Sequence, residues 1–196
     1  MVLDKSKKNK IMPHRTFIAI NLPEPIKQKL LNYQCKWPEF PAKWTKKENL
    51  HFTLVFFNNL SDNQLITVSD IVKHVITKHR QFIINLSKIC YGPIKKFPPR
   101  MIWALNDKNI YLENLRHDLY QSLENVGINF DKETRGIFHI TLARIRQMEL
   151  RNMELEEIPE INEDLELNFS VSTIELIESH LKKTGPDYNI LASFNL

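Results

Sequence analysis

Glycine is scarce in this sequence: only 4 of the 196 residues are glycine, and none forms a glycine-rich loop of the type that binds a nucleotide phosphate. The two cysteines, Cys35 and Cys90, lie far apart and outside any CxxC or Cys/His spacing, which indicates neither a zinc site nor a disulfide framework. No apolar run approaches the roughly 18 residues of a membrane-spanning helix, and no signal peptide is recognisable. We therefore expect a cytoplasmic protein with no metal, no cofactor and no membrane partner.

The remaining composition is that of an ordinary globular chain. A hydrophobic content of 42% is sufficient for a sizeable core, and a net charge of +4 is compatible with a polyanionic partner without identifying one. Four lysines lie within residues 1–14, which we predict to be a flexible basic arm. The acidic stretch at residues 149–166 is interrupted by Pro159, so we predict a solvated connection there.

One order of elements occurs twice, in residues of about 15–92 and 100–196. In each half an arginine opens a strand-like run, a segment with helical spacing follows, and a second strand-like run contains a histidine. The arginine precedes that histidine by 36 positions in the first half and by 39 in the second. Such self-similarity predicts a single domain over residues 1–196, built from two pseudo-symmetric halves.

The pattern of apolar residues predicts six strands and three helices. The predicted strands lie at residues 15–22, 50–57, 81–92, 100–105, 136–145 and 167–179, and the predicted helices at 26–37, 61–79 and 110–127. Alternating strands and helices are also typical of a parallel α/β sheet. The scarcity of glycine and the short separation of several strands favour antiparallel pairing instead. We therefore predict an α+β fold in which two antiparallel sheets line a central cleft, with helices outside.

A His-x-Thr tripeptide lies in corresponding strands of the two halves. The motif residues are His51 and Thr53 in the first half and His139 and Thr141 in the second. Since alternate residues of a strand point to the same side, each motif places its imidazole and its hydroxyl on one polar face. One such tripeptide is common in a half-buried strand, whereas a matched pair favours a functional role. A two-fold relationship between the halves brings the two polar faces together across the cleft.

Two imidazoles on either side of a phosphodiester suit hydrolysis without a metal. One imidazole accepts a proton from water while the other donates a proton to the departing ribose oxygen. The ordinary histidine pKa, near 6.5, makes both protonation states accessible in a cell. The threonine hydroxyls are suited to donate hydrogen bonds to the non-bridging phosphate oxygens. A strained five-membered cyclic phosphate lowers the barrier that such a site has to overcome.

Other polar and aromatic side chains allow two interpretations each. Arg144 follows the second motif and is suited to bind a phosphate, but strand parity points it away from His139 and Thr141 unless the strand bulges or ends there. A solvated arginine at the strand end is the alternative. Five aromatic residues are candidates to stack on a base, although core packing is the simpler interpretation: Trp44, Phe56, Phe57, Tyr91 and Trp103. The remaining histidines have no spacing typical of a metal site.

Together these segments resemble the two-histidine (2H) phosphoesterase superfamily, and within it the RNA 2′,3′-cyclic phosphodiesterases long called 2′-5′ RNA ligases. The resemblance covers nearly the whole chain and is carried by RTFIAINLPEPIKQKL, WTKKENLHFTLVFF, PPRMIWAL, FHITLARI and IELIESHLKKTGPDYNIL. It implies a bilobal duplicated fold, no metal, and hydrolysis that leaves a 2′-phosphate. It implies that His51 is the proton donor and His139 the proton acceptor. It also places three residues on the phosphate: Thr53, Thr141 and Arg144.

Within this resemblance the substrate stays open. We expect RNA, such as tRNA fragments or other oligonucleotides with 2′,3′-cyclic phosphate ends, with weak reverse ligase activity on 2′-5′ linkages and a monomeric protein. The alternatives are a phosphodiesterase acting on 2′-5′ oligoadenylate or on ADP-ribose cyclic phosphate, and a non-catalytic nucleotide- or RNA-binding module. Two departures from the family pattern, Asn58 for a glycine and Lys43 for an arginine, touch loops near the cleft.

Overall fold

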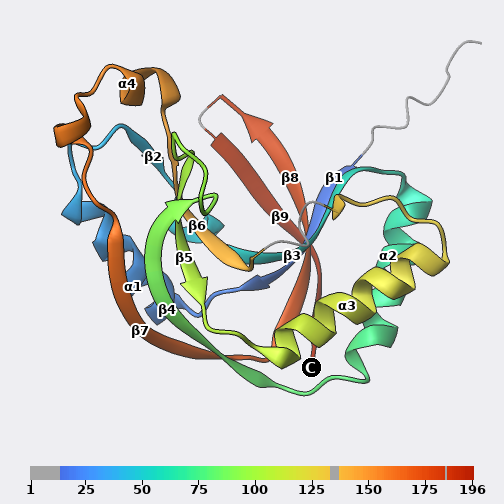
Figure 1. The fold of residues 1–196 in the computed structure, drawn as a ribbon. Helices are drawn as coiled ribbons and strands as arrows, with labels where there is room; N and C mark the ends of the chain where they lie inside the picture. The colour runs from blue at the N-terminus through green and yellow to red at the C-terminus, as the bar shows by residue number, and fades with distance from the viewer. Residues whose placement is uncertain (1–13, 133–136, 184) are drawn as a thin grey trace, which may run out of the picture.

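The computed structural model of the chain describes residues 14–132, 137–183 and 185–196 (Figure 1). These residues form a mixed α+β fold around one large antiparallel sheet, which confirms the predicted fold class. The strands are β1 (His14–Asn21), β2 (Ala42–Trp44), β3 (His51–Leu60), β4 (Phe82–Gly92), β5 (Met101–Asn106), β6 (His139–Ile145), β7 (Asn162–Val171), β8 (Thr173–Lys182) and β9 (Gly185–Asn195). The α-helices are α1 (Glu24–Asn32), α2 (Asp62–Ile76), α3 (Ile110–Asn125) and α4 (Gln147–Arg151).

The sheet consists of two lobes that meet between β3 and β6. The strand order is β7-β4-β5-β6-β3-β1-β8-β9, with β2 beside β6. We call β3, β1, β8 and β9 the first lobe, and β6, β5, β4, β7 and β2 the second lobe. A single registered pair, Phe52 with Ile140, joins β3 to β6. Figure 1 shows β4 and β7 on one side of this joint and β8 and β9 on the other. The two predicted sheets are therefore the two lobes of one continuous sheet.

Each lobe has the same order outward from the joint. The first strand begins with the motif histidine, the second contains the repeated arginine (β1) or directly follows it (β5), and two further strands come next. The third strand of each lobe comes from the opposite half of the sequence, since β8 pairs with β1 while β4 pairs with β5. Two helices also pack on the lobe of the opposite half: α3, from the second half, contacts β3, and α1, from the first half, contacts β7. The predicted halves thus interleave in space, and their origin by duplication stays a prediction.

The helix α2 illustrates how local sequence determines the element boundaries. The Ser61 hydroxyl accepts a hydrogen bond from the backbone N–H of Gln64, and the Gln64 side chain accepts one in return from the backbone N–H of Ser61. The apolar stripe of α2 packs against α3 and β9. Figure 1 shows α2 and α3 lying together on one side of the first lobe. Among the described residues, no helix has the length and apolar character needed to span a membrane.

Several predicted boundaries were wrong. β3 continues through Asn58 and Asn59 instead of ending there, and the predicted strand at 167–179 is two strands that meet at Ser172. The acidic stretch is only partly a connection, because β7 begins within it at Asn162. In β7, Leu165, Phe169 and Val171 are buried on one face while Asp164 and Glu166 are exposed on the other, as expected for an amphipathic edge strand. His14, assigned to the basic arm, is the first residue of β1, whereas residues 1–13 lie outside the described residues.

Candidate active site

The two motif strands lie side by side at the joint between the lobes. Because Phe52 pairs with Ile140, extending this register by one residue each way places both histidines and both threonines on one face of the sheet. Each histidine then lies opposite the threonine of the other strand. The two histidines become diagonal neighbours, which lie roughly 7–8 Å apart in a regular ladder, with their Cβ atoms somewhat closer. A phosphate group fits between side chains at that separation.

Each motif strand contains a β-bulge directly after its threonine. In β3, residues 53 and 55 pair with consecutive residues of β1, so Leu54 is the extra residue. In β6, residues 141 and 143 pair with consecutive residues of β5, so Leu142 is the extra residue. A bulge reverses the inside-outside alternation that follows it. The fifth residue after each histidine, Phe56 in β3 and Arg144 in β6, therefore returns to the face that carries the histidine.

The imidazole of His51 is oriented by a backbone carbonyl and by neighbouring rings. Its Nδ1 donates a hydrogen bond to the carbonyl oxygen of Asn49 at 2.8 Å. In the neutral tautomer that this bond implies, Nε2 accepts a hydrogen bond from the Thr53 hydroxyl at 3.1 Å. The ring packs 4.8 Å from the ring of Phe17 and 5.4 Å from that of Tyr188, measured between centroids.

The imidazole of His139 has a corresponding arrangement in the second lobe. Its Nδ1 donates a hydrogen bond to the carbonyl oxygen of Ile137 at 2.9 Å, again two residues before the histidine. Its ring stacks on the indole of Trp103, with 3.8 Å between centroids and an interplanar angle of 18°. In both lobes the carbonyl fixes the tautomer, so Nε2 is the nitrogen that is presented for proton transfer.

Burial keeps both imidazoles neutral in the free protein. It lowers the pKa of His51 to about 4, a shift that the Asn49 carbonyl opposes and the charges of Lys27 and His139 reinforce. It also lowers the pKa of His139, with the Ile137 carbonyl opposing and Arg144 reinforcing the shift. A positive charge on His139 would disfavour a second one on His51, because the two imidazoles lie close enough to interact electrostatically. An anionic phosphate between them would raise both pKa values and make a protonated donor accessible.

Arg144 lies on the same face as the motif residues because of the bulge in β6. It pairs with Lys43 of β2 on one side and with Met101 of β5 on the other, and its guanidinium lies 3.7 Å from the Met101 sulfur. Its side chain is exposed, and its charge lowers the pKa of His139. Regular strand alternation would point Arg144 away from His139, and the bulge reverses that direction. The guanidinium is therefore available to an anion near His139.

Two residues that shape this site were not predicted from the sequence. Thr45 donates hydrogen bonds from its hydroxyl to the carbonyl of Thr141 and from its backbone N–H to the carbonyl of Leu142, both at 2.8 Å, which braces the bulge in β6. Tyr188 reaches His51 from β9, a strand that the sequence pattern does not predict. The only available signal for Thr45 was its place beside Trp44, and no periodic pattern marked Tyr188.

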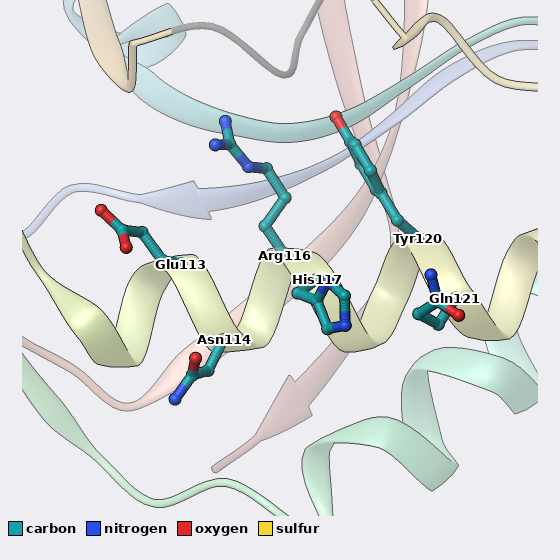
Figure 2. A pocket seen from close by; sticks show the side chains of 6 residues that line it. All are labelled: Glu113, Asn114, Arg116, His117, Tyr120 and Gln121. Carbon is teal, nitrogen blue, oxygen red and sulfur yellow. The ribbon is translucent and has the colours of Figure 1, made fainter.

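A separate hollow of about 540 Å³ lies along α3, away from the motif residues. The described residues that line it are Glu113, Asn114, Arg116, His117, Tyr120 and Gln121. Figure 2 shows Arg116 and Tyr120 extending to the same side of the helix, and the Arg116 guanidinium lies 3.7 Å over the ring of Phe138. Within the part of the chain that the structure describes, no cluster of histidine, cysteine or acidic side chains is arranged to hold a metal ion.

Comparison with known proteins gives consistent matches over most of the chain. A family model described as LigT like phosphoesterase matches residues 20–103. A relative from Methanothermobacter thermautotrophicus, named RNA 2′,3′-cyclic phosphodiesterase, is 26% identical over 187 residues, covering 94% of this chain and all of the relative. A relative of the same name from Thermotoga maritima is 27% identical over 184 residues, covering 90% of this chain and 92% of the relative.

Solved structures share the fold. A protein from Thermus thermophilus superposes with a TM-score of 0.78 at 25% identity, covering 93% of this chain and 97% of its own. Escherichia coli LigT in complex with 3′-AMP superposes with a TM-score of 0.75 at 22% identity, covering 94% of this chain and 98% of its own. Both cover the two lobes, which establishes the arrangement of the whole sheet.

Proposed function

Since this chain belongs to the LigT-like phosphoesterases of the two-histidine superfamily, we propose that it is an enzyme that hydrolyses 2′,3′-cyclic phosphate ends of RNA to 2′-phosphates. The relatives named RNA 2′,3′-cyclic phosphodiesterase cover nearly the whole chain and support this reaction. The observation that carries the proposal is the joint between β3 and β6. There, two imidazoles with the same tautomer, each oriented by the carbonyl two residues earlier, share one face of the sheet.

The proposed mechanism uses the two histidines as an acid–base pair. Nε2 of His139 accepts a proton from water while the water oxygen forms a bond to phosphorus. The bond between phosphorus and the ribose O3′ breaks, and Nε2 of protonated His51 donates its proton to that oxygen. The product has a 2′-phosphate and a 3′-hydroxyl. The family resemblance supports His51 as the donor and His139 as the acceptor, since the two carbonyl contacts alone are alike.

The remaining motif residues stabilise charge on the phosphate. In the free protein the Thr53 hydroxyl donates to Nε2 of His51, and a bound phosphate oxygen would take that hydrogen bond once Nε2 is protonated. Thr141 occupies the corresponding position in β6, where its backbone carbonyl accepts a hydrogen bond from the Thr45 hydroxyl. Arg144 contributes a fixed positive charge on the same face. All three groups lie on strands of the sheet, so they need little rearrangement when the substrate binds.

We propose that the physiological substrates are RNA fragments, including fragments of tRNA, and that the enzyme acts as a monomer in the cytoplasm. A cyclic terminal phosphate requires only that one RNA end enters the joint between the lobes, and the net charge of +4 favours a polyanion. Microscopic reversibility permits the same pair of histidines to join RNA through a 2′-5′ linkage. Hydrolysis dominates in water because water is present in large excess over any RNA hydroxyl.

The substrate is tested by supplying one purified sample with three compounds at equal concentration. These are an RNA oligonucleotide with a 2′,3′-cyclic phosphate end, a 2′-5′ oligoadenylate, and ADP-ribose 1″,2″-cyclic phosphate. We expect the largest kcat/KM on the RNA end, a product with a 2′-phosphate, and no loss of rate with EDTA. A larger kcat/KM on either of the other compounds would contradict the proposed substrate and identify that compound in its place. Binding of all three without turnover would contradict the proposed activity and indicate a non-catalytic binding module.

A further inference from the structure

Lys43 is an exposed cation on the reactive face that the proposed mechanism does not use. It lies in β2, where it pairs directly with Arg144 of β6. Directly paired residues of an antiparallel ladder point to the same side of the sheet, with their Cβ atoms roughly 4.5–5.5 Å apart. Since Arg144 shares the face of the motif residues, Lys43 extends from that face as well. Two positive side chains therefore lie next to each other at the joint between the lobes.

These two like charges have no acidic partner in the part of the chain that the structure describes. The Arg144 guanidinium contacts the Met101 sulfur, and the Lys43 side chain reaches the backbone of Gly185. Other cations close to them in the chain or in the β8–β9 hairpin each form an ion pair: Lys46 with Glu48, Lys47 with Glu24, Arg146 with Glu149, and Lys182 with Asp187. Like charges directly opposite each other in a sheet are destabilising. An anion bound between Lys43 and Arg144 would remove that cost.

Lys43 lies further along the joint than the second motif. Thr45, two residues later in the chain, donates a hydrogen bond from its hydroxyl to the carbonyl of Thr141. Two residues of extended chain span roughly 6–7 Å, so Lys43 is about that far beyond the motif. Its ammonium nitrogen lies 3.5 Å from the position that a Cβ would take on Gly185, the first residue of β9. The ammonium therefore reaches from the second lobe to the first at this end of the joint.

The opposite end of the joint has a different character. Because β3 runs antiparallel to β6, Phe56 marks that end as Arg144 marks the end near Lys43. There the Arg15 guanidinium carbon lies 5.0 Å from the centroid of the Phe56 ring, so this cation already has a partner. The backbone N–H of Asp131 donates a hydrogen bond to the Phe56 carbonyl at 2.8 Å, which brings an acidic residue to the same end. A second phosphate is therefore favoured at the end that carries Lys43 and Arg144.

We propose that Lys43, next to Arg144, binds the phosphodiester on the 5′ side of the terminal nucleotide of the RNA substrate. This inference rests on the proposed function. When the cyclic phosphate lies between the two histidines, the other anionic group of the same nucleotide is its 5′-phosphate, which the ribose holds at a distance. A lysine ammonium on a flexible stem suits such a phosphate as a compact point charge. The enzyme would therefore prefer an RNA end to a nucleoside 2′,3′-cyclic phosphate, which has no 5′-phosphate.

The test measures equilibrium binding, so it does not depend on turnover. Isothermal titration calorimetry compares adenosine 2′-monophosphate with adenosine 2′,5′-bisphosphate, which differ only in the 5′-phosphate. We expect the parent to bind the bisphosphate roughly 10- to 100-fold more tightly, as a charge-assisted hydrogen bond usually does. Lys43→Gln should lose most of this preference, whereas Lys43→Arg, which keeps the charge, should retain it. Lys78→Gln removes an exposed lysine directly after α2 and is the matched control, which should behave as the parent.

Three results would overturn the inference. They are equal affinity of the parent for the two ligands, a preference that survives in Lys43→Gln, and an equal loss of affinity for both ligands in Lys43→Gln. The last result would place Lys43 on the 2′-phosphate instead. Thermal unfolding checks that each variant is folded, and Lys43→Arg provides the reference if the glutamine variant fails.

The outcomes also separate this inference from the reaction itself. A protein that prefers the bisphosphate through Lys43 but hydrolyses none of the three substrates above would refute the proposed reaction and still support the 5′-phosphate site. A protein that hydrolyses the RNA end but binds both adenosine ligands equally would refute only the 5′-phosphate site.

Discussion

The indole of Trp103 and the imidazole of His139 are stacked at 3.8 Å between ring centroids, with an interplanar angle of 18°. Trp103 lies on the neighbouring strand, β5, where it pairs with Thr141. The indole and the carbonyl of Ile137 together restrict the orientation of the imidazole. The face of an indole also attracts a cation, so the stack stabilises the protonated form that His139 acquires when it accepts a proton.

Loss of the Trp103 ring should reduce turnover more than substrate binding. We expect Trp103→Leu to lower kcat by roughly ten- to hundredfold, because His139 loses its fixed orientation. KM should change much less, since the phosphate contacts stay in place. Trp103→Phe keeps a stacked ring and should recover most of the rate. Steady-state kinetics on the cyclic-phosphate RNA end measure both constants; an unchanged kcat in Trp103→Leu would show that the stack has no role in the reaction.

Gly92 leaves the space that the Trp103 indole occupies. A Cβ added at Gly92 would lie 2.2 Å from the indole ring, so an alanine there must displace the ring that supports His139. We expect Gly92→Ala to lose roughly 1–3 kcal/mol of unfolding free energy, as overpacking usually does, and to lose activity as well. Urea unfolding and kinetics measure the two effects.

A second glycine provides the control for this experiment. Gly127 has a φ of +71° but open space around its Cβ position, so Gly127→Ala should cost roughly 1 kcal/mol of backbone strain and leave kcat unchanged. If Gly92→Ala likewise retained full activity, the indole would not be required in its present position.

The predicted core of the site follows from short-range patterns in the sequence. Strand periodicity identifies β3 and β6, and alternation places the histidine and threonine of each motif on one face. The bulges were detectable in principle. Leu54 is followed by Val55, and Leu142 by Ala143, so two adjacent buried residues interrupt the alternation in each strand. That interruption marks the bulge in each strand, and the bulge returns Phe56 and Arg144 to the reactive face.

Long-range pairing could not be predicted in the same way. β9 alternates weakly, because most of its residues are exposed, so Tyr188 was not recognised as a neighbour of His51. β2 has only three residues, fewer than a periodic pattern requires. The exchange of β4 and β8 between the lobes depends on which strand edges meet in space, and neither propensity nor spacing encodes that choice locally.

The pKa of His51 predicts how stability depends on pH. Burial lowers the pKa to about 4 from an ordinary value of 6.5, so between these values the unfolded chain binds a proton that the folded protein does not. Stability therefore decreases as pH falls from about 6.5 to about 4. A His51→Gln variant lacks this contribution and should lose less of its melting temperature over that range. Thermal unfolding at several pH values compares the two proteins; parallel curves would contradict the burial of a neutral imidazole.

Arg144 should contribute to catalysis mainly through its charge and planar geometry. We expect Arg144→Gln to reduce kcat/KM on the RNA end by roughly ten- to hundredfold, the usual effect of losing a charged hydrogen bond to phosphate. Arg144→Lys should recover part of the loss but not all, since a lysine cannot bind two oxygens side by side. Arg80→Gln removes an exposed arginine outside the site and serves as the control. Equal kinetics of the two glutamine variants would place Arg144 outside the reaction.

The central claim is that two imidazoles act on one phosphate, and replacing each of them tests it most directly. The rate of single-turnover hydrolysis of an RNA end with a 2′,3′-cyclic phosphate should fall at least about a hundredfold in each single variant, His51→Ala and His139→Ala. The double variant should be little slower than either single variant, because the two histidines act as one unit. A variant that lacks both imidazoles and still hydrolyses the cyclic phosphate at the parent rate would contradict the claim.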